Sequence, residues 1–77
     1  MKLRKILAAN LRREMSVRGL SQSELARQIG VAPARVNEIL AGKYSPTLDT
    51  VERLAAGLGI LPTVLLLPSA EPIASHD

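Results

Sequence analysis

The chain of 77 residues contains no cysteine, phenylalanine or tryptophan, and only one tyrosine and one histidine. Without cysteine there is no disulfide framework and no thiolate metal site. We expect His76, close to the C-terminus, to be an untethered polar residue rather than a metal ligand. The sequence has no glycine-rich phosphate loop and no cluster of acids, so it gives no support for an enzyme or for a cofactor.

Long apolar segments are also missing. The longest apolar run, residues 60–67, contains a proline and a threonine and is much shorter than the ~20 residues that span a bilayer. Near the N-terminus, Asn10, Arg12 and Arg13 interrupt the apolar residues too early for a signal peptide. We therefore expect a soluble, cytoplasmic protein with no membrane partner.

The charges that are present are distributed unevenly. Residues 2–43 carry nine Lys and Arg against three acidic residues, whereas residues 44–77 carry one Arg against four acidic residues. This asymmetry suits a polyanionic partner on the first half of the chain. A solvated basic face would have the same composition, so charge alone leaves both interpretations open.

Apolar periodicity and helix-end signals predict an all-α chain of five helices around a small aliphatic core. The first is expected over residues 2–18, because apolar residues recur at every fourth position and Gly19 can end a helix in the left-handed conformation. The apolar stripe consists of Leu3, Leu7, Leu11 and Met15.

The next two helices form the most informative part of the sequence. Ser21 and Glu24 have the spacing of a capping box, which places a helix start after Ser21. Gly30 ends that helix, and a third begins near Pro33 and ends before Gly42. The inward-facing residues are Leu25, Ala26, Ile29, Val31, Val36, Ile39 and Leu40. Two short helices joined by a glycine turn are typical of a helix-turn-helix, whose second helix can lie in the DNA major groove.

Two further helices are predicted after a polar loop. Thr47 caps the fourth, over residues 48–58, and the short fifth over residues 62–66 ends at Pro68. The apolar face of the fourth helix consists of Leu48, Val51, Leu54, Ala55 and Leu58. Residues 68–77 show no periodicity and are expected to form a flexible tail.

Residues 7–66 resemble the lambda-repressor-like helix-turn-helix family, the compact five-helix domain of phage repressors and many small bacterial regulators. The resemblance rests on Leu11-Arg12-Arg13, residues 19–26 and 29–31, Ala41-Gly42-Lys43, residues 46–51, Leu54-Ala55 and Leu58-Gly59-Ile60. It implies a sequence-specific regulator of transcription that binds double-stranded DNA. A helical domain that serves only protein contacts is the alternative.

The family places the first part of the third helix in the major groove. By position, the expected base-contacting residues are Ala32, Pro33, Ala34, Arg35, Asn37 and Glu38. Asn37 can pair bidentately with adenine, whereas Pro33 and Ala34 can pack on a thymine methyl. Arg35 can read guanine, clamp a phosphate or form a surface ion pair with Glu38.

Phosphate contacts are expected on both sides of that helix. The residues are Gln22, Ser23, Lys43, Tyr44 and Ser45. Gln22 and Ser23 begin the second helix, where free amides and the helix dipole favour an anion. Tyr44 stands in a polar loop. Two roles are open for it: its hydroxyl donates a hydrogen bond to a phosphate, or its ring packs on the core.

The sequence departs from the family pattern in three ways. Ala32 stands where a Ser or Thr cap is common, and Pro33 and Ala34 replace longer polar side chains. These changes indicate dependence on methyl contacts and DNA shape. Met15 and Leu40 stand where some phage members carry an Arg–Glu pair, and we expect them to pack together as an apolar pair.

The family commonly dimerises through the region of the fifth helix. The aliphatic residues there exceed what one short helix can bury, so we expect residues 1–67 to form a DNA-binding domain with a self-complementary dimerisation segment. Its members are Leu61, Val64, Leu65, Leu66 and Leu67. The alternative is that these side chains only cap the core.

We expect a dimeric repressor on a palindromic operator, because no activation or ligand-binding domain is seen. A phage repressor, a restriction-modification controller and a self-repressing regulator all fit. An antitoxin, which neutralises a toxin by protein contact and represses its own operon, is the alternative. Binding of residues 68–77 to a partner, or a neighbouring toxin gene, would favour it.

Overall fold

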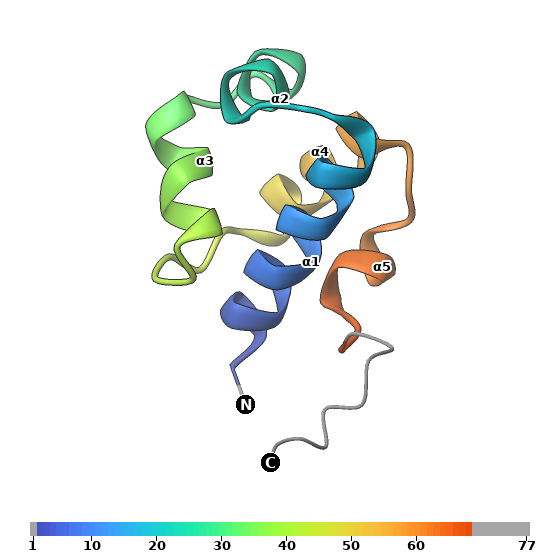
Figure 1. Cartoon of the computed structure of the whole chain (residues 1–77). Helices are drawn as coiled ribbons and strands as arrows, with labels where there is room; N and C mark the ends of the chain where they lie inside the picture. The colour runs from blue at the N-terminus through green and yellow to red at the C-terminus, as the bar shows by residue number, and fades with distance from the viewer. Residues whose placement is uncertain (1, 69–77) are drawn as a thin grey trace.

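The computed structural model describes residues 2–68, and every regular element in that range is an α-helix (Figure 1). The helices are α1 (Leu3–Arg18), α2 (Gln22–Ile29), α3 (Pro33–Leu40), α4 (Leu48–Leu58) and α5 (Pro62–Leu66). The predicted all-α, five-helix fold is confirmed, with α1 beginning one residue later than expected. The predicted tail beyond Pro68, including His76, lies outside the described residues.

The ends of α2 follow the local sequence signals. The Ser21 hydroxyl accepts a hydrogen bond from the Glu24 amide at 3.0 Å, and the Glu24 carboxylate accepts one from the Ser21 amide at 2.8 Å. The predicted capping box is therefore present. Hydrogen bonding by Ser21 lowers the pKa of the Glu24 carboxyl below its ordinary value. The Ser21 backbone amide makes the larger contribution and the Ser21 side chain the smaller one. Gly30 has φ 71°, the left-handed conformation in which the chain leaves α2 and turns towards α3.

A single aliphatic cluster joins the five helices. Its fully buried members include Leu7, Leu11, Leu25, Val36, Ile39, Leu54 and Leu65. Met15 and Leu40 belong to the same buried cluster, as expected for an apolar pair between α1 and α3. Thr47 caps α4 by accepting a hydrogen bond from the Thr50 amide at 3.1 Å, which confirms the predicted helix start.

Two leucines expected in the core are instead on the surface. Leu3 is 61% exposed and Leu48 is 76% exposed. Each is the first residue of its helix, and the residue about one turn later, Leu7 or Val51, is buried. The apolar stripe of each helix was thus correctly placed, but its first residue extends beyond the core.

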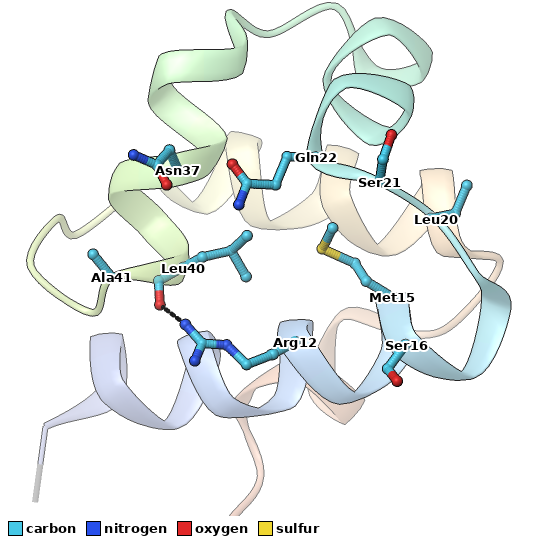
Figure 2. Close-up of a pocket in the computed structure, with 9 residues that line it drawn as sticks. All are labelled: Arg12, Met15, Ser16, Leu20, Ser21, Gln22, Asn37, Leu40 and Ala41. Atoms are coloured by element: carbon cyan, nitrogen blue, oxygen red, sulfur yellow. Dashed lines mark hydrogen bonds between the residues drawn. The ribbon is translucent and has the colours of Figure 1, made fainter.

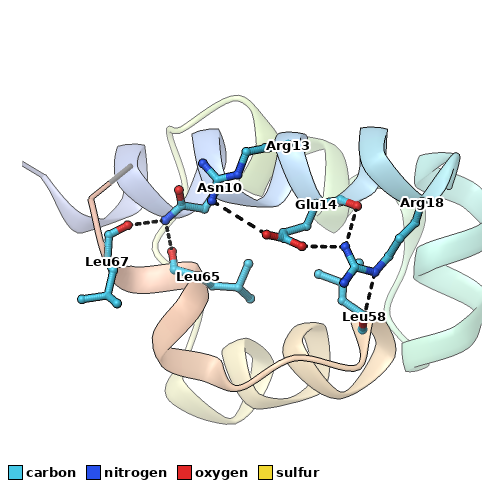
Figure 3. A network of polar contacts seen from close by, with 7 residues as sticks. All are labelled: Asn10, Arg13, Glu14, Arg18, Leu58, Leu65 and Leu67. Atoms are coloured by element: carbon cyan, nitrogen blue, oxygen red, sulfur yellow. Dashed lines mark hydrogen bonds and ion pairs between the residues drawn. The ribbon is translucent and has the colours of Figure 1, made fainter. Parts of the chain in front are cut away.

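The helix α1 lies between α3 and α5 and contacts both (Figure 1). On the α5 side, the buried Asn10 amide donates to the carbonyl oxygens of Leu65 at 2.8 Å and Leu67 at 2.6 Å (Figure 3). Farther along α1, Arg18 donates to the Leu58 carbonyl oxygen at 3.0 Å. Polar side chains of α1 therefore fix the ends of α4 and α5.

The contact between α2 and α4 depends on a glycine inside a helix. A Cβ atom added to Gly57 would lie 2.6 Å from Cγ2 of Ile29, which is closer than two carbon atoms approach. Because Ile29 is β-branched and buried, its methyl group has little freedom to move. Gly57 therefore lets α4 approach the end of α2. This role of Gly57 was not predicted from the sequence.

Candidate nucleic-acid interface

The exposed face of α3 carries the residues expected to meet DNA bases. Those fully on the surface are Ala32, Pro33, Ala34, Asn37 and Glu38, whereas Arg35 is half-buried. Val36 and Ile39 on the opposite face are buried. Ala32 caps α3 without a side-chain hydrogen bond, as its residue type predicts, and Pro33 occupies the first turn.

Arg35 is held by two neighbours rather than extending freely. Its Nε lies 3.4 Å from Oε1 of Glu38, and its Cζ lies 4.1 Å from the centroid of the Tyr44 ring. Tyr44 is half-buried and packs against the core. The surface ion pair considered for Arg35 is present, and so is the core packing considered for Tyr44. The contact between these two side chains was not predicted, since it depends on how the loop after α3 folds back.

The residues expected to meet phosphates flank α3. Gln22 and Ser23 are exposed in the first turn of α2, where backbone amides have no acceptor within the helix. Lys43 and Ser45 are exposed in the loop that follows α3. Exposed amides and an ammonium group therefore lie on either side of the α3 surface.

A groove of about 590 Å³ lies between α1, the start of α2 and the last part of α3. Its polar lining includes Arg12, Ser16, Gln22 and Asn37. Figure 2 shows the Gln22 side chain extending from α2 towards α3, with Arg12 on the α1 side. Arg12 donates to the Leu40 carbonyl oxygen at the end of α3. A cation at this helix end is favoured by the helix dipole, and the contact joins α1 to the candidate reading helix.

Some basic residues of α1 are neutralised within the protein. The Glu14 carboxylate pairs with Arg18, whose guanidinium also donates to the Glu14 backbone carbonyl oxygen. The same carboxylate lies 3.8 Å from Nη2 of Arg13 (Figure 3). The positive charge of the first half of the chain is therefore not uniformly available to a partner. Arg12 lines the groove, Arg35 lies on α3, and Lys43 is exposed in the loop that follows α3. Arg4 donates to the Gly42 carbonyl oxygen in the same loop at 3.2 Å.

The residues expected to form a dimer interface separate into three groups. Leu61 is 71% exposed and Leu67 is 60% exposed, whereas Val64 and Leu66 are half-buried. Leu65 is 0% exposed, so the expectation that its side chain reaches a partner is wrong. For Leu65 the alternative holds, namely that the side chain caps the core, because α5 turns it towards α1 and α4.

The apolar surface beside α5 includes residues that the prediction omitted. A groove of about 210 Å³ is lined mainly by apolar side chains from the starts of α1 and α4, the preceding loop and α5. Leu3, Leu48 and Leu66 are among them. The misplaced leucines thus extend the exposed apolar surface of α5.

Residues 2–68 contain no group of three or more His, Cys, Asp or Glu side chains placed to hold a metal ion. Within the same range, no helix is both long and apolar enough to cross a bilayer.

Comparison with known proteins identifies the class. The profile of a helix-turn-helix family matches residues 11–65. The chain belongs to this family, and its resemblance to lambda-repressor-like domains is confirmed. The match includes α2, α3 and α4, so it covers the exposed α3 face and both segments that flank it.

Individual relatives agree with this assignment. The chain is 39% identical over 69 residues to a hypothetical transcription factor of Neisseria meningitidis, covering 90% of this chain and 65% of the relative. It therefore spans slightly less than two thirds of that protein. It is 30% identical over 71 residues to y4dJ of Sinorhizobium fredii, described as an uncharacterised helix-turn-helix-type transcriptional regulator, with 92% of each chain covered.

Two solved structures resemble this chain over most of its length. The crystal structure of the hypothetical transcription factor NHTF from Neisseria aligns with a TM-score of 0.86 and 36% identity, covering 96% of this chain and 85% of that one. The restriction-modification controller protein C.AhdI from Aeromonas hydrophila aligns with a TM-score of 0.78 and 29% identity, covering 80% and 94%. The similarity therefore extends beyond α2 and α3 to most of the chain.

Proposed function

We propose that this protein is a transcriptional regulator that binds double-stranded DNA in a sequence-specific manner, with α3 in the major groove. The exposed face of α3, flanked by the start of α2 and the Lys43–Ser45 loop, is the observation that carries the proposal. An α-helix fits the major groove, and exposed amides and cations on both sides suit the two phosphate backbones. The relatives described as transcription factors support the same assignment.

Base recognition on this surface combines few hydrogen bonds with apolar contacts. Asn37 pairs with adenine, while Ala32, Pro33 and Ala34 pack against thymine methyl groups. Arg35 and Glu38 supply the charged contacts. Because three of these six residues have no polar side-chain atom, DNA shape carries a large share of the selectivity.

Phosphate binding positions α3 without selecting sequence. Gln22 and Ser23 bind one backbone through their side chains and the amides at the start of α2. Lys43, Ser45 and the Tyr44 hydroxyl bind the backbone on the other side. Arg12 adds a cation to the groove beside Gln22. This set predicts binding that weakens as salt concentration rises.

Two copies act together on a palindromic operator. A single helix-turn-helix reads few base pairs, whereas a two-fold dimer reads two half-sites about 34 Å apart. The exposed leucines that flank α5, Leu61 and Leu67, together with Leu3 and Leu48, supply an apolar surface for the second copy. A dimer bound over a promoter acts as a repressor by excluding the polymerase. The similarity to C.AhdI supports control of a restriction-modification system as one setting for this activity.

The dimer is tested by sedimentation of a matched pair of variants. Leu67→Asp places a charge on the exposed apolar surface directly after α5, whereas Val17→Asp places one on α1 at a residue that is 76% exposed. At tens of micromolar protein, we expect a dimer for the original protein and for Val17→Asp, and a monomer for Leu67→Asp. A monomeric original protein would contradict the proposed dimer but not the proposed binding of DNA.

Selection of bound duplexes from random DNA tests the function itself. The expected result is a family of enriched sequences with two inverted half-sites whose centres are about one helical turn apart. Enrichment of a single, unpaired half-site would contradict the palindrome. Failure to enrich any sequence, with retention independent of salt, would contradict DNA binding and favour a domain that contacts only proteins.

A further inference from the structure

The α3 surface contains an acid that a phosphate-rich partner would repel. Glu38 is exposed on the same helix face as Asn37, where it would meet DNA. Its carboxylate is paired with Nε of Arg35 at 3.4 Å. Arg35 in turn lies over the ring of Tyr44, with Cζ 4.1 Å from the centroid. The three side chains form one connected unit at the boundary between α3 and the following loop.

This geometry limits what the Arg35 guanidinium can do. The guanidinium carbon lies over the Tyr44 ring, and Glu38 occupies the Nε edge. Among the described side chains, these are the contacts that orient it, so the two terminal amino groups remain available to donate outwards in the same plane. A pair of parallel donors matches a pair of acceptors, such as O6 and N7 on the major-groove edge of guanine.

The aromatic support is itself fixed. Tyr44 is half-buried and packs against the hydrophobic core, so the ring cannot follow the arginine as a flexible side chain would. An arginine has several rotatable bonds, and holding it before binding reduces the entropy lost on contact. The ring attracts the cation as well, because the face of an aromatic ring carries a partial negative charge.

We infer that Tyr44 is a positioning residue that holds Arg35 to read a guanine, and that Glu38 completes the unit by fixing the Nε edge. This inference rests on the proposed DNA-binding function and adds a specificity device to it. It assigns the Tyr44 ring a role distinct from that of its hydroxyl. It also explains why an acid is tolerated on the α3 face, since Arg35 offsets its charge.

The test separates the ring from the hydroxyl. The probe is the duplex enriched by the original protein, together with copies in which one base pair at a time is replaced. The quantity measured is the discrimination ratio, the dissociation constant for a replaced duplex divided by that for the enriched one. Tyr44→Phe keeps the ring and removes the hydroxyl, whereas Tyr44→Leu keeps apolar bulk and removes the ring.

We expect Arg35→Ala to lower the discrimination ratio at one G·C pair in each half-site by about 5- to 150-fold. Tyr44→Leu should lower the ratio at the same pair by about 2- to 5-fold, while Tyr44→Phe leaves it unchanged. In the Arg35→Ala background, Tyr44→Leu should have no further effect on the ratio. Such non-additivity is the expected signature of a residue that acts through another.

Control measurements distinguish positioning from folding and from charge. The thermal midpoint shows whether Tyr44→Leu remains folded, and Tyr44→Phe supplies the conservative rescue. Arg53→Ala removes one positive charge on α4 next to Gln28, away from the α3 face, and should leave every discrimination ratio unchanged.

Several results would overturn the inference. Equal discrimination by Tyr44→Leu and Tyr44→Phe would contradict the positioning role. A uniform loss of affinity for all duplexes in Arg35→Ala would identify a phosphate contact instead of a guanine contact. If the original protein retains no duplex at all, the proposed DNA-binding function itself fails. If it retains duplexes but Tyr44→Leu and Tyr44→Phe discriminate equally, only the positioning role of Tyr44 fails.

Discussion

The α2–α3 unit and the α5 segment both belong to the domain that surrounds α1, yet different interactions hold them in place. The α2–α3 unit depends on signals within a few residues: the Ser21–Glu24 capping box, the turn at Gly30 and the apolar spacing of both helices. The five-residue α5 is held mainly by contacts from distant parts of the chain, including the Asn10 side chain. Local signals therefore specify the candidate reading unit, whereas long-range contacts specify the candidate dimer surface.

The largest expected effect comes from removing the long-range support of α5. Asn10→Ala deletes the donor for two carbonyl oxygens, one of them in a buried bond, and should lower the free energy of unfolding by about 3 kcal/mol. Amide hydrogen exchange should show selective loss of protection in α5, with α2 and α3 little changed. Ser16→Ala, at an exposed position on the same helix, is the matched control and should change stability by less than about 0.5 kcal/mol. Unchanged protection of α5 in Asn10→Ala would contradict the comparison.

A smaller effect is expected where α2 meets α4. Alanine favours a helix over glycine by about 1 kcal/mol, so propensity alone predicts that Gly57→Ala stabilises the protein. We expect a net destabilisation of about 1 kcal/mol instead, because the added methyl group would overlap the Ile29 side chain. Ala56→Gly, at the exposed neighbouring position, reports the propensity effect alone and should also destabilise by about 1 kcal/mol. A more stable Gly57→Ala protein, measured by urea unfolding, would show that the two helices can separate without loss.

The smallest effect is a pH dependence within the capping box. The folded-state pKa of Glu24 is lowered, so its ionised form contributes stability above its ordinary value near 4.5, and this contribution is lost as pH falls through the lowered folded value. Glu24→Gln keeps a side chain that can accept the Ser21 hydrogen bond but does not titrate. Between about pH 7 and about pH 3, the original protein should lose more stability than Glu24→Gln, in thermal unfolding. Equal losses in the two proteins would contradict the assigned role of this carboxylate.

Much of the fold could be predicted because its signals are local. The start of α2, the turn at Gly30 and the cap at Thr47 each depend on residues within one helical turn. Leu3 and Leu48 were assigned to the core because periodicity identifies a helix face without showing how far the core extends along it. The partners of Asn10 and Gly57 were unpredictable for a related reason, since each contact joins helices separated by many residues.

The same distinction between local and long-range contacts decides which parts of the candidate interface could be predicted. The exposed positions of α3 follow from its helical period, so Asn37 and Glu38 could be placed from the sequence. The unit formed by Arg35 and Tyr44 could not, because the two residues are brought together by the path of the loop after α3. The sequence did contain one clue: the only tyrosine of the chain stands shortly after an arginine on the predicted reading helix.

The most direct test of the account is a comparison of Asn37→Ala with Lys43→Ala over every single base-pair replacement of the enriched duplex. If α3 reads the major groove, Asn37→Ala should lose about 1–3 kcal/mol of discrimination at one base pair in each half-site. Lys43→Ala should weaken binding to all of the duplexes nearly equally and reduce the salt dependence. Identical profiles for the two variants, or unchanged affinity in both, would contradict the central claim that α3 is the reading helix.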